Sequence, residues 1–142
     1  MNNYIELAEH FFQISYQLKK MAHQEEIDQS LKGEIFTLLY LKRKNESILP
    51  SEISEVMTIS TARVTAILNN LEKKRLIARE IDKFDRRKVQ VKLTKLGKKE
   101  ANSYYKKVIN QIIKMFELIG KEDSKELTRI TSKIANLKIK EG

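Results

Sequence analysis

The segment SEVMTISTARVTAILNNLEKKRLIAREIDKFDRRKVQVKLT, residues 54–94, changes its hydrophobic period partway along. Its first half places apolar residues at i, i+3, i+4 and i+7, which predicts an amphipathic helix with Ser60 as its N-cap: Val64, Ile67, Leu68 and Leu71. Its second half contains two short runs of alternating apolar and polar residues on either side of DKFDRR, residues 82–87. We therefore expect a helix followed directly by a β-hairpin with one buried face.

The outer surfaces of this helix and hairpin differ from ordinary solvated surfaces. An exposed helix is usually covered by Glu and Lys, whereas the outer face of this helix carries small or hydrogen-bonding residues: Ala62, Thr65, Ala66, Asn69 and Lys73. The hairpin bend carries Arg86, Arg87 and Lys88. A compact polar helix can enter the major groove of DNA, which is about 12 Å wide, and a cationic tip suits the negative potential of the minor groove. The segment predicts a winged helix-turn-helix.

The remaining sequence predicts helices, because the chain has only one proline and four glycines. Apolar or small residues recur every three or four positions in residues 4–24 and in two helices after Thr94, the second of which follows GKEDS at residues 120–124. Residues 33–42 predict a short buried helix, and Ser51 is expected to cap the next one after Pro50. The expected fold class is mainly α with a small β-hairpin wing.

The net charge of +9 is unevenly distributed along the 142 residues. Residues 1–50 carry −1, residues 51–100 carry +6, and residues 101–142 carry +4. A basic excess centred on the predicted hairpin favours a polyanionic partner, with nucleic acid ahead of an anionic membrane surface. The alternative interpretation is a lysine-rich surface that is merely solvated.

Several function classes find no support in the sequence. Cysteine is absent, so disulfides, thiolate metal sites and cysteine nucleophiles are excluded. There is no glycine-rich phosphate loop, HExxH motif or nucleophile elbow, so we expect no enzyme and no cofactor. His10 and His23 lack nearby metal-ligating partners, so no metal site is predicted. The N-terminus lacks the order of a secretory signal and no apolar run approaches a membrane span, so we expect a cytoplasmic protein with no membrane contact.

Two stretches of the chain resemble the MarR family of bacterial transcription regulators. LPSEISEVMTISTARVTAILNNLEKKRLIARE is similar to the family's helix-turn-helix, and DRRKVQVKLTKLGKK is similar to its wing, second strand and entry to a long helix. The resemblance implies a homodimer with a winged helix-turn-helix domain at residues 31–97. It also implies a helical dimerisation region at residues 1–30 and 98–142. The DNA partner would be double-stranded and would contain a palindromic operator. The resemblance favours a repressor over an activator.

The resemblance also implies roles for individual residues. Ser60 would cap the recognition helix, Asp85 would orient a wing arginine, and Arg87 would probe the minor groove. The DNA-binding set on the recognition helix is Ser60, Thr61, Ala62, Arg63, Thr65 and Asn69, and the set on the wing is Asp85, Arg86, Arg87 and Lys88. Thr58 and Arg75 stand at turn positions where the family usually has glycine, so left-handed backbone there would cost about 1 kcal/mol each.

The family places an effector cleft between its dimerisation helices and its winged domain. By resemblance, six aromatic residues are candidates to line such a cleft for a small lipophilic or phenolic effector: Phe11, Phe12, Phe36, Tyr40, Tyr104 and Tyr105. Each of them could instead be a plain core residue. Two other functions remain open: an architectural, sequence-independent DNA-binding protein, and a winged-helix module for protein association.

Overall fold

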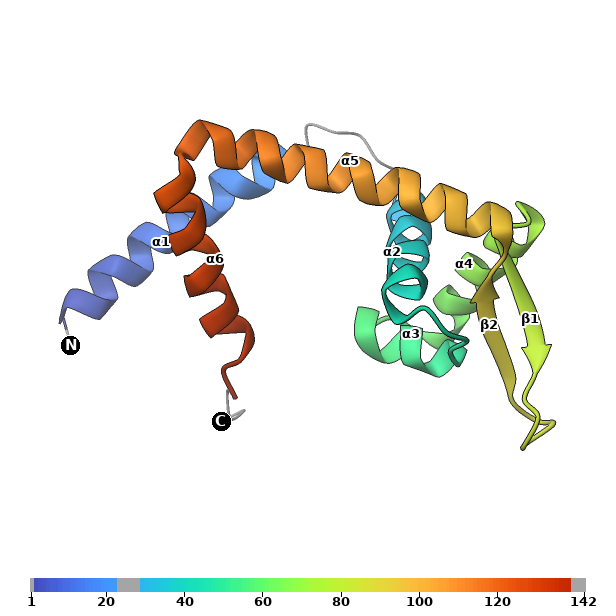
Figure 1. Ribbon diagram of the computed structural model, residues 1–142. Helices are drawn as coiled ribbons and strands as arrows, with labels where there is room; N and C mark the ends of the chain where they lie inside the picture. Colours follow the sequence, from blue (N-terminus) through green and yellow to red (C-terminus); the bar gives the residue numbers. More distant parts are fainter. Residues whose placement is uncertain (1, 23–28, 139–142) are drawn as a thin grey trace.

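The computed structural model of the protein describes residues 2–22 and 29–138, which form six helices and one two-stranded antiparallel hairpin. Figure 1 shows an elongated molecule in which one long helix joins a compact group of elements to two outlying helices. The predicted fold class, mainly α with a β-hairpin wing, is confirmed. The elements are α1 (Asn2–Ala22), α2 (Gln29–Lys44), α3 (Pro50–Met57), α4 (Thr61–Lys73), β1 (Ile77–Ile81), β2 (Val89–Leu93), α5 (Lys95–Ile119) and α6 (Lys121–Ala135).

The hydrophobic core lies entirely within the winged half of the molecule. Helices α2, α3 and α4, both strands and the first turns of α5 all contribute to it. The four apolar residues predicted on one face of α4 are all buried, as the helical period requires. The other buried apolar residues are Leu38, Tyr40, Leu41, Ile48, Ile53, Leu76, Ile77, Val91 and Ala101.

The helix starts show which capping predictions hold. Ser60 caps α4 as predicted, because its Oγ accepts a hydrogen bond from the Arg63 N–H at 3.2 Å. The prediction that Ser51 caps α3 is wrong. Leu49 is the N-cap without any side-chain bond, and Pro50 is the first helical residue. Proline presets φ for a first helical position and has no N–H, so the helix begins two residues earlier than expected, at Pro50 in place of Glu52.

Two residues have a left-handed backbone conformation, one at the end of α3 and one in the turn after α4. Thr58 has φ 54° and Arg75 has φ 62°, in agreement with the expectation that these positions favour glycine. The Arg75 carbonyl accepts a hydrogen bond from Thr94 Oγ1 at 2.7 Å, and Thr94 Oγ1 also accepts from the Gly97 N–H at 3.0 Å. Thr94 thus caps α5 and fixes the turn that leads into β1.

The hairpin is buried at its base and exposed at its tip. Ile77 pairs with Leu93, Arg79 with Val91, and Ile81 with Val89. Val91 is fully buried and exchanges two backbone hydrogen bonds with Ile48, whereas Ile81 is 65% exposed. The prediction of one buried face therefore holds only at the base, because the strands extend beyond the core that covers them.

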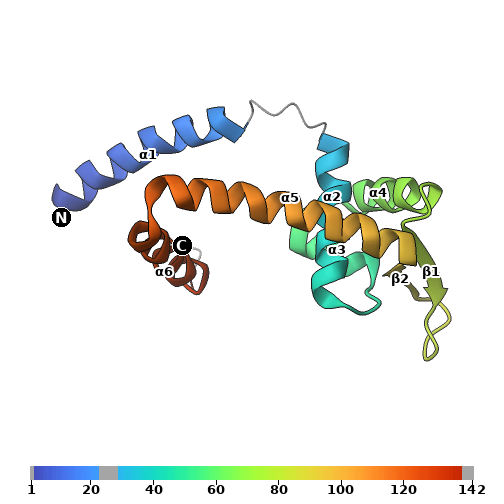
Figure 2. The ribbon, with the colours of Figure 1, turned by 45° about the horizontal axis from the view of Figure 1, so that its top comes forward.

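Helices α1 and α6 and the second half of α5 lie outside the core. Figure 2 shows α1 as a separate rod remote from the winged half, and α1 packs extensively against no other described element. Helix α6 begins directly after Gly120, whose φ is 94°, so the turn is shorter than the predicted GKEDS. No helix within residues 2–22 and 29–138 is long and apolar enough to cross a membrane. The division at residues 31–97 stays a prediction.

Candidate nucleic-acid interface

The predicted recognition surface lies on the exposed side of α4. Every residue of the predicted set is exposed, from the Ser60 cap to Asn69. Thr65 is exposed, and its Oγ1 donates to the Thr61 carbonyl at 2.9 Å, so the hydroxyl oxygen can still accept a hydrogen bond. The surface offers small side chains and hydroxyl groups near the helix N-terminus, with the Arg63 guanidinium as the one cation among residues 60–69.

The wing tip carries exposed cations whose positions are set by an aspartate. Asp85 Oδ1 accepts from the backbone N–H of Arg87 at 3.0 Å and from its Nε at 3.2 Å. This contact is the pairing of a wing carboxylate with an arginine that the resemblance implied. Arg86, Arg87 and Lys88 are all exposed around it, so the tip presents positive charge outward.

A second aspartate, which the sequence reasoning missed, closes the hairpin loop. Asp82 Oδ1 accepts from the Phe84 N–H at 2.7 Å and from the Asp85 N–H at 3.3 Å. Its Oδ2 accepts from Gln90 Nε2 at 2.9 Å. These bonds, led by that from the Phe84 N–H, hold the pKa of Asp82 below its ordinary value. An aspartate two residues before a turn residue is a recognisable Asx-turn signal, and DKFD contained it.

An arginine on the first strand joins the wing to the recognition helix, and the sequence reasoning missed it too. Arg79 Nη2 donates to Asn69 Oδ1 at 2.7 Å, and its Nε lies 3.1 Å from Glu72 Oε2. Asn69 was assigned to DNA, but its side-chain oxygen is engaged within the protein. The two contacts tie β1 to the exposed side of α4.

The six aromatic residues assigned to an effector cleft do not form one group in a single chain. Phe36 and Tyr40 stack on α2 with ring centroids 6.2 Å apart, and Tyr104 and Tyr105 lie on α5, which packs against α2. Tyr40 is buried and donates to Glu52, a hydrogen bond that raises the pKa of Tyr40. Phe11 and Phe12 lie exposed on α1, which packs extensively against neither α2 nor α5.

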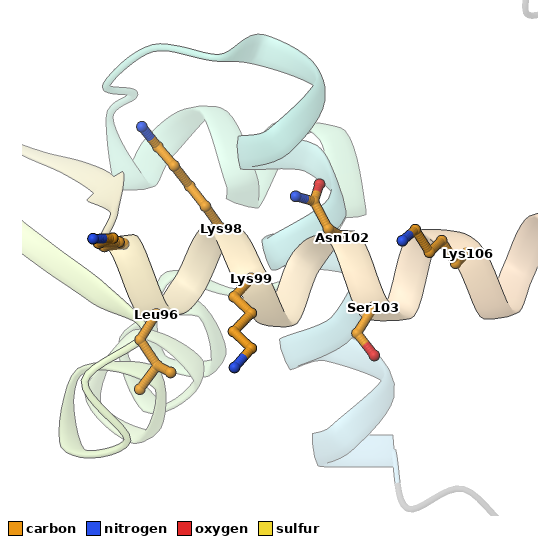
Figure 3. Close-up of a pocket in the computed structure, with 7 residues that line it drawn as sticks. Leu96, Lys98, Lys99, Asn102, Ser103 and Lys106 are labelled. Atoms are coloured by element: carbon orange, nitrogen blue, oxygen red, sulfur yellow. The ribbon is translucent and has the colours of Figure 1, made fainter.

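Two surface hollows lie against α5, and none of the six aromatic residues lines either of them. Figure 3 shows that the side chains around one hollow diverge, with Lys98 and Asn102 on one side of the helix and Lys99 and Ser103 on the other. Such an arrangement encloses no ligand. Among the described residues, no three potential metal ligands lie together, and His23 falls outside the described ranges.

A capped recognition helix followed by a short turn and a hairpin tied to it defines a winged helix-turn-helix protein. Comparison with known proteins gives the family. Residues 33–88 match the MarR family. The chain belongs to the MarR family of transcriptional regulators, as the resemblance suggested.

Individual relatives support this assignment. The repressor MdtR of Bacillus subtilis is 33% identical over 105 residues, which is 72% of this chain and 66% of MdtR. The uncharacterized HTH-type regulator YwaE of the same organism is 27% identical over 133 residues, or 93% of this chain and 78% of YwaE. Bacillus subtilis YusO, whose crystal structure is known, is 26% identical in sequence. Its structure matches with a TM-score of 0.67 over 94% of this chain and 98% of YusO. That of a Staphylococcus aureus MepR–DNA complex has a similar fold, with 22% identity, a TM-score of 0.64, and coverage of 91% and 95%.

Proposed function

We propose that the protein is a homodimeric, cytoplasmic repressor that binds palindromic operator DNA and is modulated by a small effector. Helix α4 enters the major groove with residues 60–69, and the wing tip, residues 85–88, enters the adjacent minor groove. The observation that carries the proposal is the bond between Arg79 and Asn69, which locks a compact polar helix face to a cationic wing. The chain has no catalytic role in this proposal. MdtR is named a repressor, and MepR has been crystallised with DNA.

The surface of a single chain supports the dimer. It exposes 12190 Å², whereas a folded monomer of 16.7 kDa exposes about 7,600 Å². Large apolar side chains are exposed on α1, α5 and α6, which belong to the proposed dimerisation region of residues 1–30 and 98–142. They include Ile5, Leu7, Phe11, Phe12 and Leu18 on α1, Ile112, Ile113, Met115 and Leu118 on α5, and Leu127, Ile130 and Ile134 on α6. A second copy of the chain would cover these stripes and hold the two recognition helices about 34 Å apart, one turn of DNA.

Effector control follows from that spacing. A lipophilic or phenolic ligand that binds better to one separation of the winged domains than to another shifts the dimer toward that separation. The proposed site comprises the aromatic residues of α2 and α5, since Phe36 and Tyr105 are partly exposed and Lys42 Nζ of α2 lies 4.5 Å from the centroid of the Tyr105 ring. Phe11 and Phe12 would join it only if α1 packs over that group in the dimer.

A binding titration tests the proposal. Duplexes selected from a random pool by the purified protein should bind at least about a thousandfold more tightly than random duplexes, and should contain an inverted repeat. Affinity should fall steeply with salt, because each phosphate that the protein neutralises releases counterions. Uniform binding to all duplexes would indicate an architectural protein, and no binding at low salt would indicate a protein-association module.

Two substitutions test the site within the same experiment. Arg87→Ala should weaken binding to all duplexes alike, since a wing contact to the backbone and the minor groove carries little sequence information. Arg63→Ala should instead change the preferred base at one position of each half-site, at about 1–3 kcal/mol. If neither substitution alters binding to the selected duplex, the site assignment is wrong.

A further inference from the structure

The free end of the wing presents apolar side chains among its cations. Phe84 is 100% exposed, and the cross-strand neighbours Ile81 and Val89 are 65% and 38% exposed. We call these three residues the wing-tip patch. Figure 1 shows that the hairpin loop projects beyond every other element of the winged half. A phenylalanine ring that is fully exposed at the outermost point of a domain contributes nothing to the core.

The loop that carries Phe84 is held in place by its own hydrogen bonds. Asp82 accepts from the Phe84 and Asp85 N–H groups, the Asp82 N–H donates to the Lys88 carbonyl at 2.9 Å, and the Lys88 N–H donates to the Asp85 carbonyl at 3.0 Å. The backbone beneath the ring is therefore fixed before any partner arrives. A preordered loop loses little conformational entropy on binding, so burial of the ring would contribute to affinity.

The charges around the patch identify the chemistry of its partner. Four exposed cations lie within four residues of Phe84 in the same loop, namely Lys83, Arg86, Arg87 and Lys88. The carboxylates of Asp82 and Asp85, the latter paired with Arg87 at 3.2 Å, cancel two of these four charges, so residues 82–88 keep a net charge of +2. A partner that combines dense negative charge with apolar faces at the same spacing satisfies both features, and the walls of the DNA minor groove consist of phosphates and deoxyribose.

We propose that Phe84 is a non-ionic anchor of the wing, whose ring packs against deoxyribose in the minor groove while the neighbouring arginines neutralise phosphates. This inference rests on the proposed DNA-binding function. The contribution of Phe84 to DNA affinity should differ from that of the adjacent cations in its dependence on salt concentration. An apolar contact releases no counterions, so it adds the same factor to affinity at every salt concentration, whereas a phosphate contact weakens as salt rises.

Fluorescence anisotropy with the selected duplex over a range of salt concentrations tests the inference. Phe84→Ala should weaken binding about five- to tenfold at each concentration, with the slope of log affinity against log salt unchanged. Phe84→Leu should keep most of the affinity. Phe84→Asn, whose side chain is branched like that of leucine but polar, should lose as much affinity as Phe84→Ala does. Arg87→Ala is the matched ionic control, and its slope should be shallower by about one for each phosphate lost. The thermal midpoint of each Phe84 variant should equal that of the unsubstituted protein, since the side chain is fully exposed.

Each contrary result has a distinct meaning. If the unsubstituted protein binds the duplex and all three Phe84 variants bind equally well, the anchor is refuted and the proposed function stands. If the unsubstituted protein binds no duplex, both fail. A photoreactive p-benzoylphenylalanine at position 84 should crosslink to DNA in the complex. A crosslink to protein, or none at all, would also refute the anchor, whatever the affinity data show.

Discussion

At the scale of single residues, the left-handed backbone at Thr58 contributes strain to the turn of the helix-turn-helix. A residue with a Cβ at φ 54° meets its own carbonyl, and a β-branched residue does so most severely. Thr58→Gly should therefore stabilise the protein by about 0.5 kcal/mol, the relief of about 1 kcal/mol of strain less the greater entropy of glycine in the unfolded chain. Urea denaturation measures the difference.

Thr58→Ala is the control for that prediction. Alanine removes the hydroxyl and the β-branch but keeps a Cβ at the same positive φ, so its gain should be clearly smaller than that of glycine. The Thr58 side chain is exposed, so neither change disturbs packing. Equal stabilisation by alanine and glycine would mean that branching, and not the left-handed backbone, is the source of the strain.

At the scale of elements, the LTKLG sequence at residues 93–97 acts as a joint between the wing and α5. The Thr94 N–H donates to the Leu76 carbonyl at 3.1 Å, which brings the first turn of α5 against the turn that follows α4. A Cβ on Gly97 would lie 1.9 Å from the same Leu76 oxygen, and backbone atoms cannot move aside as a flexible side chain can. Glycine is required there for close approach, since its φ is not left-handed.

Gly97→Ala should consequently destabilise the protein by about 3 kcal/mol, the upper range for overpacking a tight contact. Lys98→Ala is the control. It introduces alanine at the next position of α5, where the side chain is exposed. Thermal and urea unfolding of the two variants give the comparison. Equal stability of both would show that α5 can shift away from the turn without loss.

The elements also show which features could be predicted from sequence. The α4 stripe, the Ser60 cap and the two strands depend on periodicity and on neighbours within four residues, so they were predictable. The Arg79–Asn69 bond joins residues ten apart across a change from helix to strand, and no local pattern encodes it. The exposure of Ile81 was unpredictable for a related reason. Alternation places a residue on a face of the hairpin, but only the extent of the core decides whether that face is covered.

At the scale of the whole molecule, the described chain has a complete core at one end and exposed apolar stripes at the other. Every buried apolar residue lies between Leu38 and Ala101. The outlying helices therefore leave their apolar stripes uncovered within the chain, whereas the winged half packs around its own core. This asymmetry predicts that an acidic residue within the stripes will separate subunits and leave the winged half folded.

The double variant Ile112→Glu, Ile130→Glu places one charge in the stripe of α5 and one in that of α6, where the side chains are 38% and 42% exposed in the single chain. Sedimentation velocity should show a dimer for the unsubstituted protein and a monomer for the variant, because an unpaired carboxylate is costly to bury at an interface. Lys114→Glu, at an exposed position of the same helix, should remain dimeric.

Affinity for the inverted repeat should fall at least about a hundredfold in the double variant, since the second half-site no longer binds intramolecularly. Affinity for an isolated half-site should be unchanged. If the unsubstituted protein sediments as a monomer at micromolar concentration, its two recognition helices cannot be held one turn of DNA apart, and the proposed mode of operator binding fails.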